Sequence, residues 1–239
     1  MTKPIDTLMV FAAGFGTRMK AATKTTPKSL IKVHGKPILY YVLDSALRHG
    51  GFKNIFVNTH YLSDQIEDAV RHFESSRIDC PKITLLHEEE LLDTGGTIKN
   101  GLKYFNSDAI VTHNSDVILK SDKDFFGSLK DSWDPEIMDF LMLVYETEKA
   151  VGYVGKGDFI LSKNNQLLRP KNESNYPYMY TGAAILKPGL IASNPKTVFS
   201  LQGYYDNPQN IYGCRHYGSW CHLSSPEDII STEQNLRPF

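Results

Sequence analysis

Two basic side chains follow a glycine-containing turn near the beginning of the sequence. Gly14 and Gly16 lie within Phe11–Leu30, and Arg18 and Lys28 come after them in the same stretch. Glycines let a backbone approach a ligand closely, and the two cations add permanent positive charge beside it. Backbone N–H groups, arginine and lysine are the groups with which proteins bind phosphate. The stretch therefore predicts a phosphate-binding loop.

The elements that must position this loop alternate between apolar strands and helices. The predicted strands cover residues 7–13, 54–59, 82–87, 108–117 and 139–146, and the predicted helices cover 37–51, 63–73, 95–105 and 124–133. Such alternation indicates a parallel sheet with helices on both faces, which binds ligands at the carboxyl ends of its strands. Gly14, Asp93–Gly96 and Asn114–Asp116 are each placed at the carboxyl end of a predicted strand, so we expect them to converge on one site. Ser63 is the expected cap of the second helix.

The pattern changes after residue 150. A hairpin is predicted over 159–170 with its turn at Asn164–Asn165, and further strands are predicted over 178–188 and 215–223. A last helix is predicted over 225–236, because Ser225, Pro226 and Asp228 form a capping-box pattern. Pro170–Tyr180 is the expected mobile loop.

Composition narrows the classes of protein that remain. The chain has 239 residues and a net charge of −1, so it has no overall basic field for nucleic acid. Three cysteines without a framework spacing favour a reducing compartment. The sequence has neither a signal-peptide pattern nor the roughly 20 consecutive apolar residues of a membrane helix. We expect a single cytoplasmic domain over 1–239 that binds no membrane, as a monomer or small homo-oligomer.

Other interpretations of the motifs fit less well. A dinucleotide-binding fingerprint requires a third glycine where Met19 stands, and a P-loop requires a Gly-Lys-Ser/Thr sequence that is missing from the turn. A plain turn with solvated cations is a further alternative for the opening stretch. Cys214, His216, Cys221 and His222 match no standard zinc-finger spacing, which favours ordinary core cysteines.

The opening stretch also resembles a family signature. Ala12-Ala13-Gly14-Phe15-Gly16-Thr17-Arg18 and Pro27-Lys28-Ser29-Leu30 are similar to the signature of the sugar-1-phosphate nucleotidylyltransferases. "VNTHYLSDQIEDAV", "LLDTGGTIKNGL" and "HNSDV" resemble segments of the branch that contains N-acetylmuramate-1-phosphate uridylyltransferases and mannose-1-phosphate guanylyltransferases. "GDF", "YTGAAIL" and "GSWCHLSSPEDI" stand where that family has its later motifs, so the resemblance covers nearly the whole chain in order.

The resemblance implies a fold. It is a Rossmann-like, three-layer α/β/α nucleotidyltransferase fold of GT-A-like type, with a mixed, mainly parallel central sheet. Residues 1–150 would form a nucleotide-binding half and residues 151–239 a sugar-binding half. The chain shows no β-helix repeat after these halves, so we expect no fused acyltransferase.

The resemblance also implies a reaction and its residues. A sugar-1-phosphate attacks the α-phosphorus of a nucleoside triphosphate and pyrophosphate leaves, without a covalent enzyme intermediate. Arg18 and Lys28 would be the catalytic cations, because alignment and charge neutralisation supply most of the catalysis. The implied nucleotide-binding residues are Ala12, Ala13, Gly14, Gly16, Thr17, Gly95 and Gly96. The implied sugar-binding residues are Asn114, Asp158 and Gly182.

The implied metal site departs from the family pattern at one position. Asp116 would bind Mg²⁺, but His222 stands where the family has its second metal-binding aspartate. Imidazole is a poor ligand for Mg²⁺ and a better one for Mn²⁺, which makes Mn²⁺ the alternative cofactor. Three further residues depart from the family pattern: Ser29 stands in place of a proline, and Thr97 and Ser115 each stand in place of a glycine. The enzyme would therefore use Mg²⁺ through Asp116 alone, use Mn²⁺, or bind nucleotide without turnover.

The predicted function is the transfer of a nucleotidyl group from UTP to N-acetylmuramate-1-phosphate in peptidoglycan recycling. A mannose- or glucose-1-phosphate nucleotidylyltransferase with a different base is the near alternative. A catalytically impaired protein that only binds sugar nucleotides is the alternative from another class, favoured by His222 and Ser115.

Overall fold

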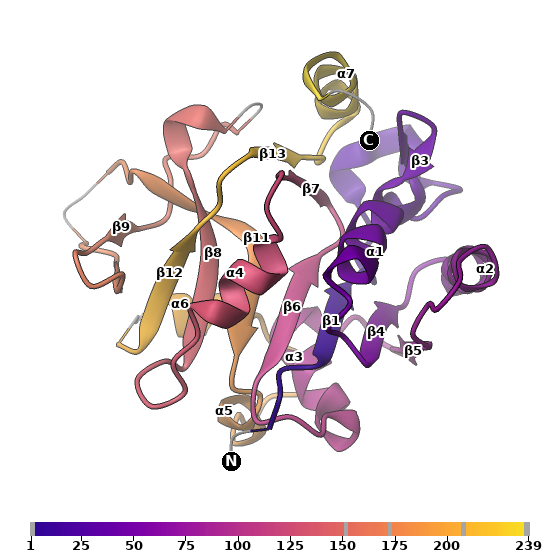
Figure 1. Cartoon of the computed structure of the whole chain (residues 1–239). Coiled ribbons are helices and arrows are strands. Elements are labelled where there is room, and N and C mark those ends of the chain that lie inside the picture. Colours follow the sequence, from indigo (N-terminus) through magenta and orange to yellow (C-terminus); the bar gives the residue numbers. More distant parts are fainter. Residues whose placement is uncertain (1–2, 151–152, 172–173, 207–208, 237–239) are drawn as a thin grey trace.

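A seven-stranded sheet runs through the molecule, and helices cover both of its faces (Figure 1). The computed structural model describes residues 3–150, 153–171, 174–206 and 209–236. Across the sheet, the order of strands is β12 (Ile211–Arg215), β8 (Phe140–Glu146), β11 (Tyr178–Leu186), β6 (Ile110–Asn114), β1 (Thr7–Phe11), β4 (Asn54–Thr59) and β5 (Ile83–His87). Strand β11 runs antiparallel to both of its neighbours, whereas the other pairs are parallel. The predicted mixed, mainly parallel sheet is therefore confirmed.

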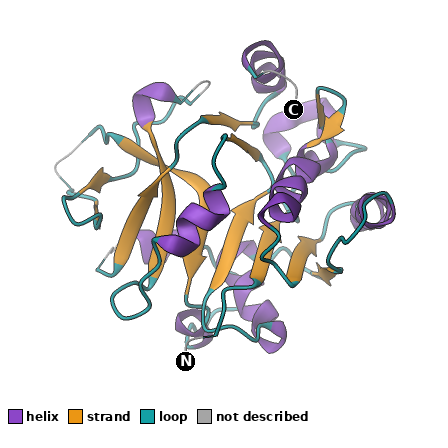
Figure 2. Cartoon of the chain, in the orientation of Figure 1, coloured by secondary structure: helices purple, strands orange, loops and turns teal. Residues whose placement is uncertain are grey.

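Two layers of helices enclose the sheet (Figure 2). The helices of one layer are α1 (Ile38–His49), α2 (Ser63–Ser75) and α4 (Phe125–Asp131), and those of the other are α3 (Asp93–Gly101), α5 (Gly189–Ala192) and α6 (Gln202–Tyr205). Leu8 and Val10 of β1 belong to the core on the first side, and Met9 belongs to the core on the second. Because neighbouring strand residues point to opposite faces, both faces of β1 are buried and its sequence is apolar throughout.

Sequence signals at the helix ends are confirmed at most positions. Helix α1 follows Pro37 and ends at Gly50, whose φ of 68° is the left-handed conformation that glycine adopts freely. Helix α7 (Pro226–Asn235) begins with the predicted capping box of Ser225 and Asp228. The predicted cap of α2 is wrong: Leu62 precedes that helix in a left-handed conformation, and Ser63 is its first residue.

Two predicted strands are each interrupted, and both interruptions shape the site. The strand predicted over 108–117 divides into β6 and β7 (Val117–Lys120), because the chain turns at Ser115–Asp116. The strand predicted over 215–223 is confirmed only as β13 (Ser219–His222), because the chain leaves the preceding strand, β12, after Arg215. Strand β13 pairs with β7 so that His222 lies opposite Val117, the residue after Asp116.

The remaining elements are short. Antiparallel pairs are formed by β2 (Lys32–Val33) with β3 (Lys36–Pro37) and by β9 (Ile160–Leu161) with β10 (Leu167–Leu168). The second pair is the predicted hairpin, with Asn165 in its turn at a φ of 63°. The 3₁₀ turns are η1 (Thr17–Thr23), η2 (Lys28–Leu30), η3 (Leu102–Tyr104) and η4 (Thr147–Lys149). Residues 172–173 of the predicted mobile loop lie outside the described residues. Within the described part of the chain, the helices are too short or too polar to span a membrane.

Candidate active site

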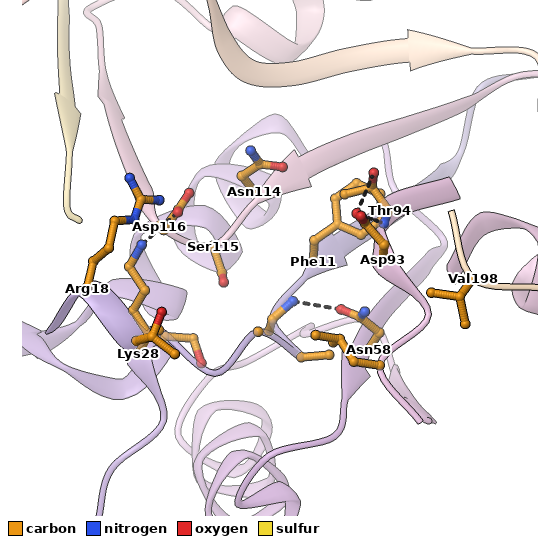
Figure 3. A pocket seen from close by; sticks show the side chains of 17 residues that line it. Phe11, Arg18, Lys28, Asn58, Asp93, Thr94, Asn114, Ser115, Asp116 and Val198 are labelled. Atoms are coloured by element: carbon orange, nitrogen blue, oxygen red, sulfur yellow. Dashed lines mark hydrogen bonds and ion pairs between the residues drawn. The ribbon is translucent and has the colours of Figure 1, made fainter. Parts of the chain in front are cut away.

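A cavity of about 490 Å³ lies at the carboxyl ends of β1, β4 and β6 (Figure 3). This is the edge at which the predicted site residues were expected to converge. The predicted residues that line the cavity are Ala12, Ala13, Gly14, Gly16, Thr17, Arg18, Lys28, Asn114 and Asp116. The sheet therefore brings the glycine turn, both cations and the carboxylate to one place.

The charged end of the cavity is built around Asp116. The Lys28 Nζ atom lies 2.7 Å from Asp116 Oδ2, and His222 Nε2 lies 3.7 Å from the same oxygen. Arg18 lines this end with an exposed side chain. Burial alone would raise the pKa of Asp116, but the neighbouring His222 imidazole and Lys28 ammonium outweigh it and hold that pKa well below its usual value. Asp116 is therefore a carboxylate at neutral pH.

The glycine turn passes directly over Lys28. Gly16 has a φ of 63°, and a Cβ atom at this position would lie 2.8 Å from the Cβ atom of Lys28. Any larger residue would be strained and would push against the lysine stem. The Gly16 carbonyl also accepts a hydrogen bond from the Thr23 hydroxyl at 3.1 Å. Glycine at this position thus allows the loop and Lys28 to occupy the same end of the cavity.

Side chains near the start of α2 hold the far part of the loop. The Tyr61 hydroxyl lies 2.9 Å from the carbonyl oxygens of both Thr23 and Lys24. The Gln65 side-chain amide donates to the Thr25 carbonyl at 2.9 Å. These residues belong to the stretch "VNTHYLSDQIEDAV", for which the sequence indicated a resemblance but no individual roles.

A buried polar network lies behind the cavity wall and reaches it at Asn58 and Ala12. Asn58 Oδ1 accepts a hydrogen bond from the Ala12 N–H at 2.7 Å, and Asn58 Nδ2 donates to Glu88 Oε1 at 2.9 Å. The Thr97 hydroxyl donates to the same Glu88 oxygen at 2.5 Å and accepts from Asn58 Nδ2 at 3.0 Å. Glu88 Oε2 accepts from the Leu92 N–H at 3.1 Å. The network links β1, β4 and α3, and it gives Thr97 a structural function.

Gly95 and Gly96 do not line the cavity, although the resemblance assigned them to the nucleobase. Their N–H groups donate to the Phe199 carbonyl at 2.9 and 3.1 Å. A Cβ atom at Gly95 would lie 2.3 Å from the Phe199 ring, and one at Gly96 would lie 2.3 Å from the Thr197 carbonyl oxygen. In the structure, these glycines allow residues 197–199 of the same chain to pack closely against α3. Their contact with a base stays a prediction.

The predicted sugar-binding residues are divided between two places. Asn114 lines the cavity, and Gly182 lies against it, since a Cβ atom at Gly182 would be 3.2 Å from the Asn114 side chain. Asp158 lies outside the cavity, where its Oδ2 atom accepts a hydrogen bond from the Tyr180 N–H at 2.9 Å. Burial raises the pKa of Asp158, although this hydrogen bond opposes the shift. Sugar binding by these residues stays a prediction.

Several residues of the cavity were given no individual role by the sequence. Asp93, Thr94 and Ser115 belong to segments that were expected to converge on the site, whereas Phe11, Ser29, Asn58, Leu91 and Val198 were not predicted there. Asn58 carried a usable signal, because it stands near the carboxyl end of a correctly predicted strand. Val198 carried none, because its place depends on contacts with α3 that are distant in the sequence.

The fold and the cavity together define an α/β protein with a cavity at the carboxyl edge of its sheet that is lined by a glycine turn, two cations and a carboxylate. Residues 7–158 match the family model for nucleotidyl transferases. N-acetylmuramate alpha-1-phosphate uridylyltransferase of Caulobacter vibrioides is 31% identical over 234 residues, covering 95% of this chain and 96% of that relative. The chain belongs to the nucleotidyl transferase family and is an enzyme of the sugar-1-phosphate nucleotidylyltransferase type.

Two other similar proteins agree with this assignment. Mannose-1-phosphate guanylyltransferase catalytic subunit beta of Danio rerio is 26% identical, with 93% of this chain and 62% of that relative covered. The structure of HddC from Yersinia pseudotuberculosis complexed with GMP-PN superposes with a TM-score of 0.76 at 22% identity, over 97% of this chain and 99% of that one. The structural similarity confirms the expected nucleotidyltransferase fold.

The buried network leads to a stability prediction for Thr97→Val. The substitution keeps the side-chain shape but removes the hydroxyl that donates to Glu88 and accepts from Asn58. We expect the free energy of unfolding to fall by about 1–3 kcal/mol, because buried polar groups lose a partner. Guanidinium unfolding measures the change.

Thr7→Val is the matched control. Thr7 is fully buried, and its hydroxyl has no hydrogen-bond partner among the described residues. Its replacement should leave stability unchanged or raise it slightly. Equal losses in both variants would show that the Thr97 network contributes nothing specific.

Proposed function

We propose that this enzyme couples UTP to N-acetylmuramate-1-phosphate, giving the UDP-sugar and pyrophosphate. The observation that supports this substrate pair is the 31% identity to a uridylyltransferase of that name over 95% of the chain. The cavity is consistent with the reaction, because it combines a glycine turn, two cations and a carboxylate. We further propose a cytoplasmic role in peptidoglycan recycling.

Each charged group has a distinct part in the proposed reaction. The sugar phosphate oxygen attacks the α-phosphorus in line with the departing pyrophosphate. The Lys28 ammonium, fixed at 2.7 Å from Asp116, neutralises charge that develops on the α-phosphate. Arg18 and the backbone N–H groups around Gly16 bind the β- and γ-phosphates of the leaving group. Catalysis thus comes from alignment and from charge that is already in place.

Asp116 is the residue that would hold a divalent cation. Its carboxylate is ionised and lines the cavity, which suits Mg²⁺ bound largely through substrate phosphates and water. The described residues contain no cluster of three or more metal-ligating side chains, so the protein itself would supply few ligands. His222 lies beside Asp116 and would favour Mn²⁺ if it takes part. The cation would supply additional positive charge at the phosphates.

Pyrophosphate release is the experiment that tests the proposal. Purified enzyme is given UTP and N-acetylmuramate-1-phosphate, first with Mg²⁺ and then with Mn²⁺, beside a panel of other triphosphates and sugar phosphates. Faster release with mannose-1-phosphate and GTP would replace the proposed substrates with those of the second relative. Nucleotide binding without release from any pair, with either metal, would show a protein that only binds sugar nucleotides.

Lys28→Ala tests the catalytic cation. Loss of the ammonium removes charge stabilisation in the transition state, so kcat should fall by about 10²–10³-fold while KM for the sugar phosphate changes little. Lys32→Ala is the matched control, since Lys32 is exposed on β2 and lies outside the cavity. Steady-state kinetics measure both variants, and an unchanged kcat for Lys28→Ala would contradict the assigned role.

His222→Asp tests the second metal position. An added carboxylate beside Asp116 should lower the Mg²⁺ concentration needed for half-maximal turnover, because Mg²⁺ prefers oxygen ligands. His222→Asn serves as the control, since it removes the imidazole without adding charge. The same Mg²⁺ dependence in all three proteins would place His222 outside the metal site.

A further inference from the structure

A segment from the second half of the chain closes one end of the cavity. We call residues 194–201 the closing segment; its Val198 lines the cavity and is 45% exposed. Figure 3 shows Val198 at the end of the cavity away from Arg18 and Lys28. The two ends therefore differ in chemistry: one is cationic, and the other is bounded by the apolar side chain of Val198 beside Asp93 and Thr94.

The backbone of the closing segment is fixed to the beginning of α3. The Phe199 carbonyl accepts hydrogen bonds from the Gly95 and Gly96 N–H groups, and the Phe199 N–H donates to the Leu92 carbonyl at 3.1 Å. The Leu201 N–H donates to Thr94 Oγ1 at 3.0 Å. These bonds follow Val198 directly in the chain, so its backbone has little freedom to move away.

The other end of the closing segment is also attached to α3. The Lys99 ammonium donates to the Asn194 carbonyl at 2.5 Å and to the Lys196 carbonyl at 3.1 Å. Since the segment is tied on both sides of Val198, this side chain is positioned before any ligand arrives. Such preorganisation lowers the entropy cost of binding.

We propose that Val198 packs against the nucleobase of the bound triphosphate and limits the size of base that the cavity accepts. The inference rests on the proposed function, which directs the phosphates to Arg18 and Lys28 and leaves the base at the opposite end. Apolar side chains form most of the contact surface in small-molecule sites, and Val198 provides one at that end. Base recognition thus includes a residue from the half of the chain that was expected to bind sugar.

The test compares two probes that share the phosphate end. UTP and inorganic tripolyphosphate are titrated by calorimetry into the full-length protein and into its Val198→Ala and Val198→Trp variants. Val198→Ala should weaken UTP binding about threefold to tenfold, as expected for the loss of two methyl contacts. Val198→Trp should abolish UTP binding by filling the base end, and tripolyphosphate should bind all three proteins equally.

Two further variants provide controls. Ile78→Ala removes a side chain that is 93% exposed in the loop after α2, and it should leave both titrations unchanged. Arg18→Ala should weaken UTP and tripolyphosphate together, because both probes carry the phosphates. Melting temperatures check that every variant is folded.

Base selectivity is the second measurement. In pyrophosphate-release assays with the four common triphosphates, Val198→Ala should reduce the preference for UTP over GTP, whereas KM for the sugar phosphate should not change. Equal loss of UTP and tripolyphosphate, or undiminished UTP binding by Val198→Trp, would overturn the assignment of Val198.

The proposed function and this inference fail in different ways. If UTP binding depends on Val198 but pyrophosphate is never released, the proposed reaction is wrong and the base contact stands. If pyrophosphate is released but UTP binding is indifferent to Val198, the reaction stands and the base contact is wrong.

Discussion

The buried carboxylate of Glu88 is the constraint on which the cavity depends. Glu88 is 2% exposed, and a carboxylate removed from water must be hydrogen-bonded to be tolerated. Its partners are the side chains of Asn58 and Thr97 and the N–H group of Leu92. Asn58 also accepts a hydrogen bond from the Ala12 N–H. The hydrogen bonds that Glu88 needs therefore connect the ends of the parallel strands β1 and β4 to α3. The geometry of the cavity wall therefore depends on hydrogen bonds to buried polar groups as well as on apolar packing.

The charged end of the cavity meets a different requirement. Asp116 is a partly buried residue of the turn between β6 and β7, and Lys28 and His222 keep it ionised when no ligand is bound. Lys28 reaches that position because Gly16 lets the loop pass close above its side chain. The same residues that stabilise the free protein therefore hold the ammonium where a phosphate would enter, so little rearrangement is needed for binding.

The sequence predicted the parts of this site that follow from local pattern. The bounds of β4 agree with the prediction. The expectation that a site forms at the carboxyl ends of the parallel strands correctly placed Asp116 at the same edge of the sheet as the loop that contains Lys28. Asp116 itself was placed inside a strand, because an apolar run cannot show where a turn separates two sheets. Thr97 looked like a mere departure from a glycine, since its partner Glu88 is identified only by the folded contacts. The position of Phe199 over Gly95 likewise depends on a contact between residues about a hundred positions apart in the sequence. A local sequence pattern cannot predict such a contact.

The second half of the chain completes the cavity at both ends. Strand β13 pairs with β7 and brings His222 to Asp116, while the closing segment brings Val198 to the opposite end. The cavity therefore draws its walls from both sides of residue 150. Since β11 also lies between β6 and β8, residues before and after that point share one sheet and one core. His222, through the pairing of β13 with β7, and Val198, through the hydrogen bonds of its segment to α3, thus reach opposite ends of the cavity by separate attachments.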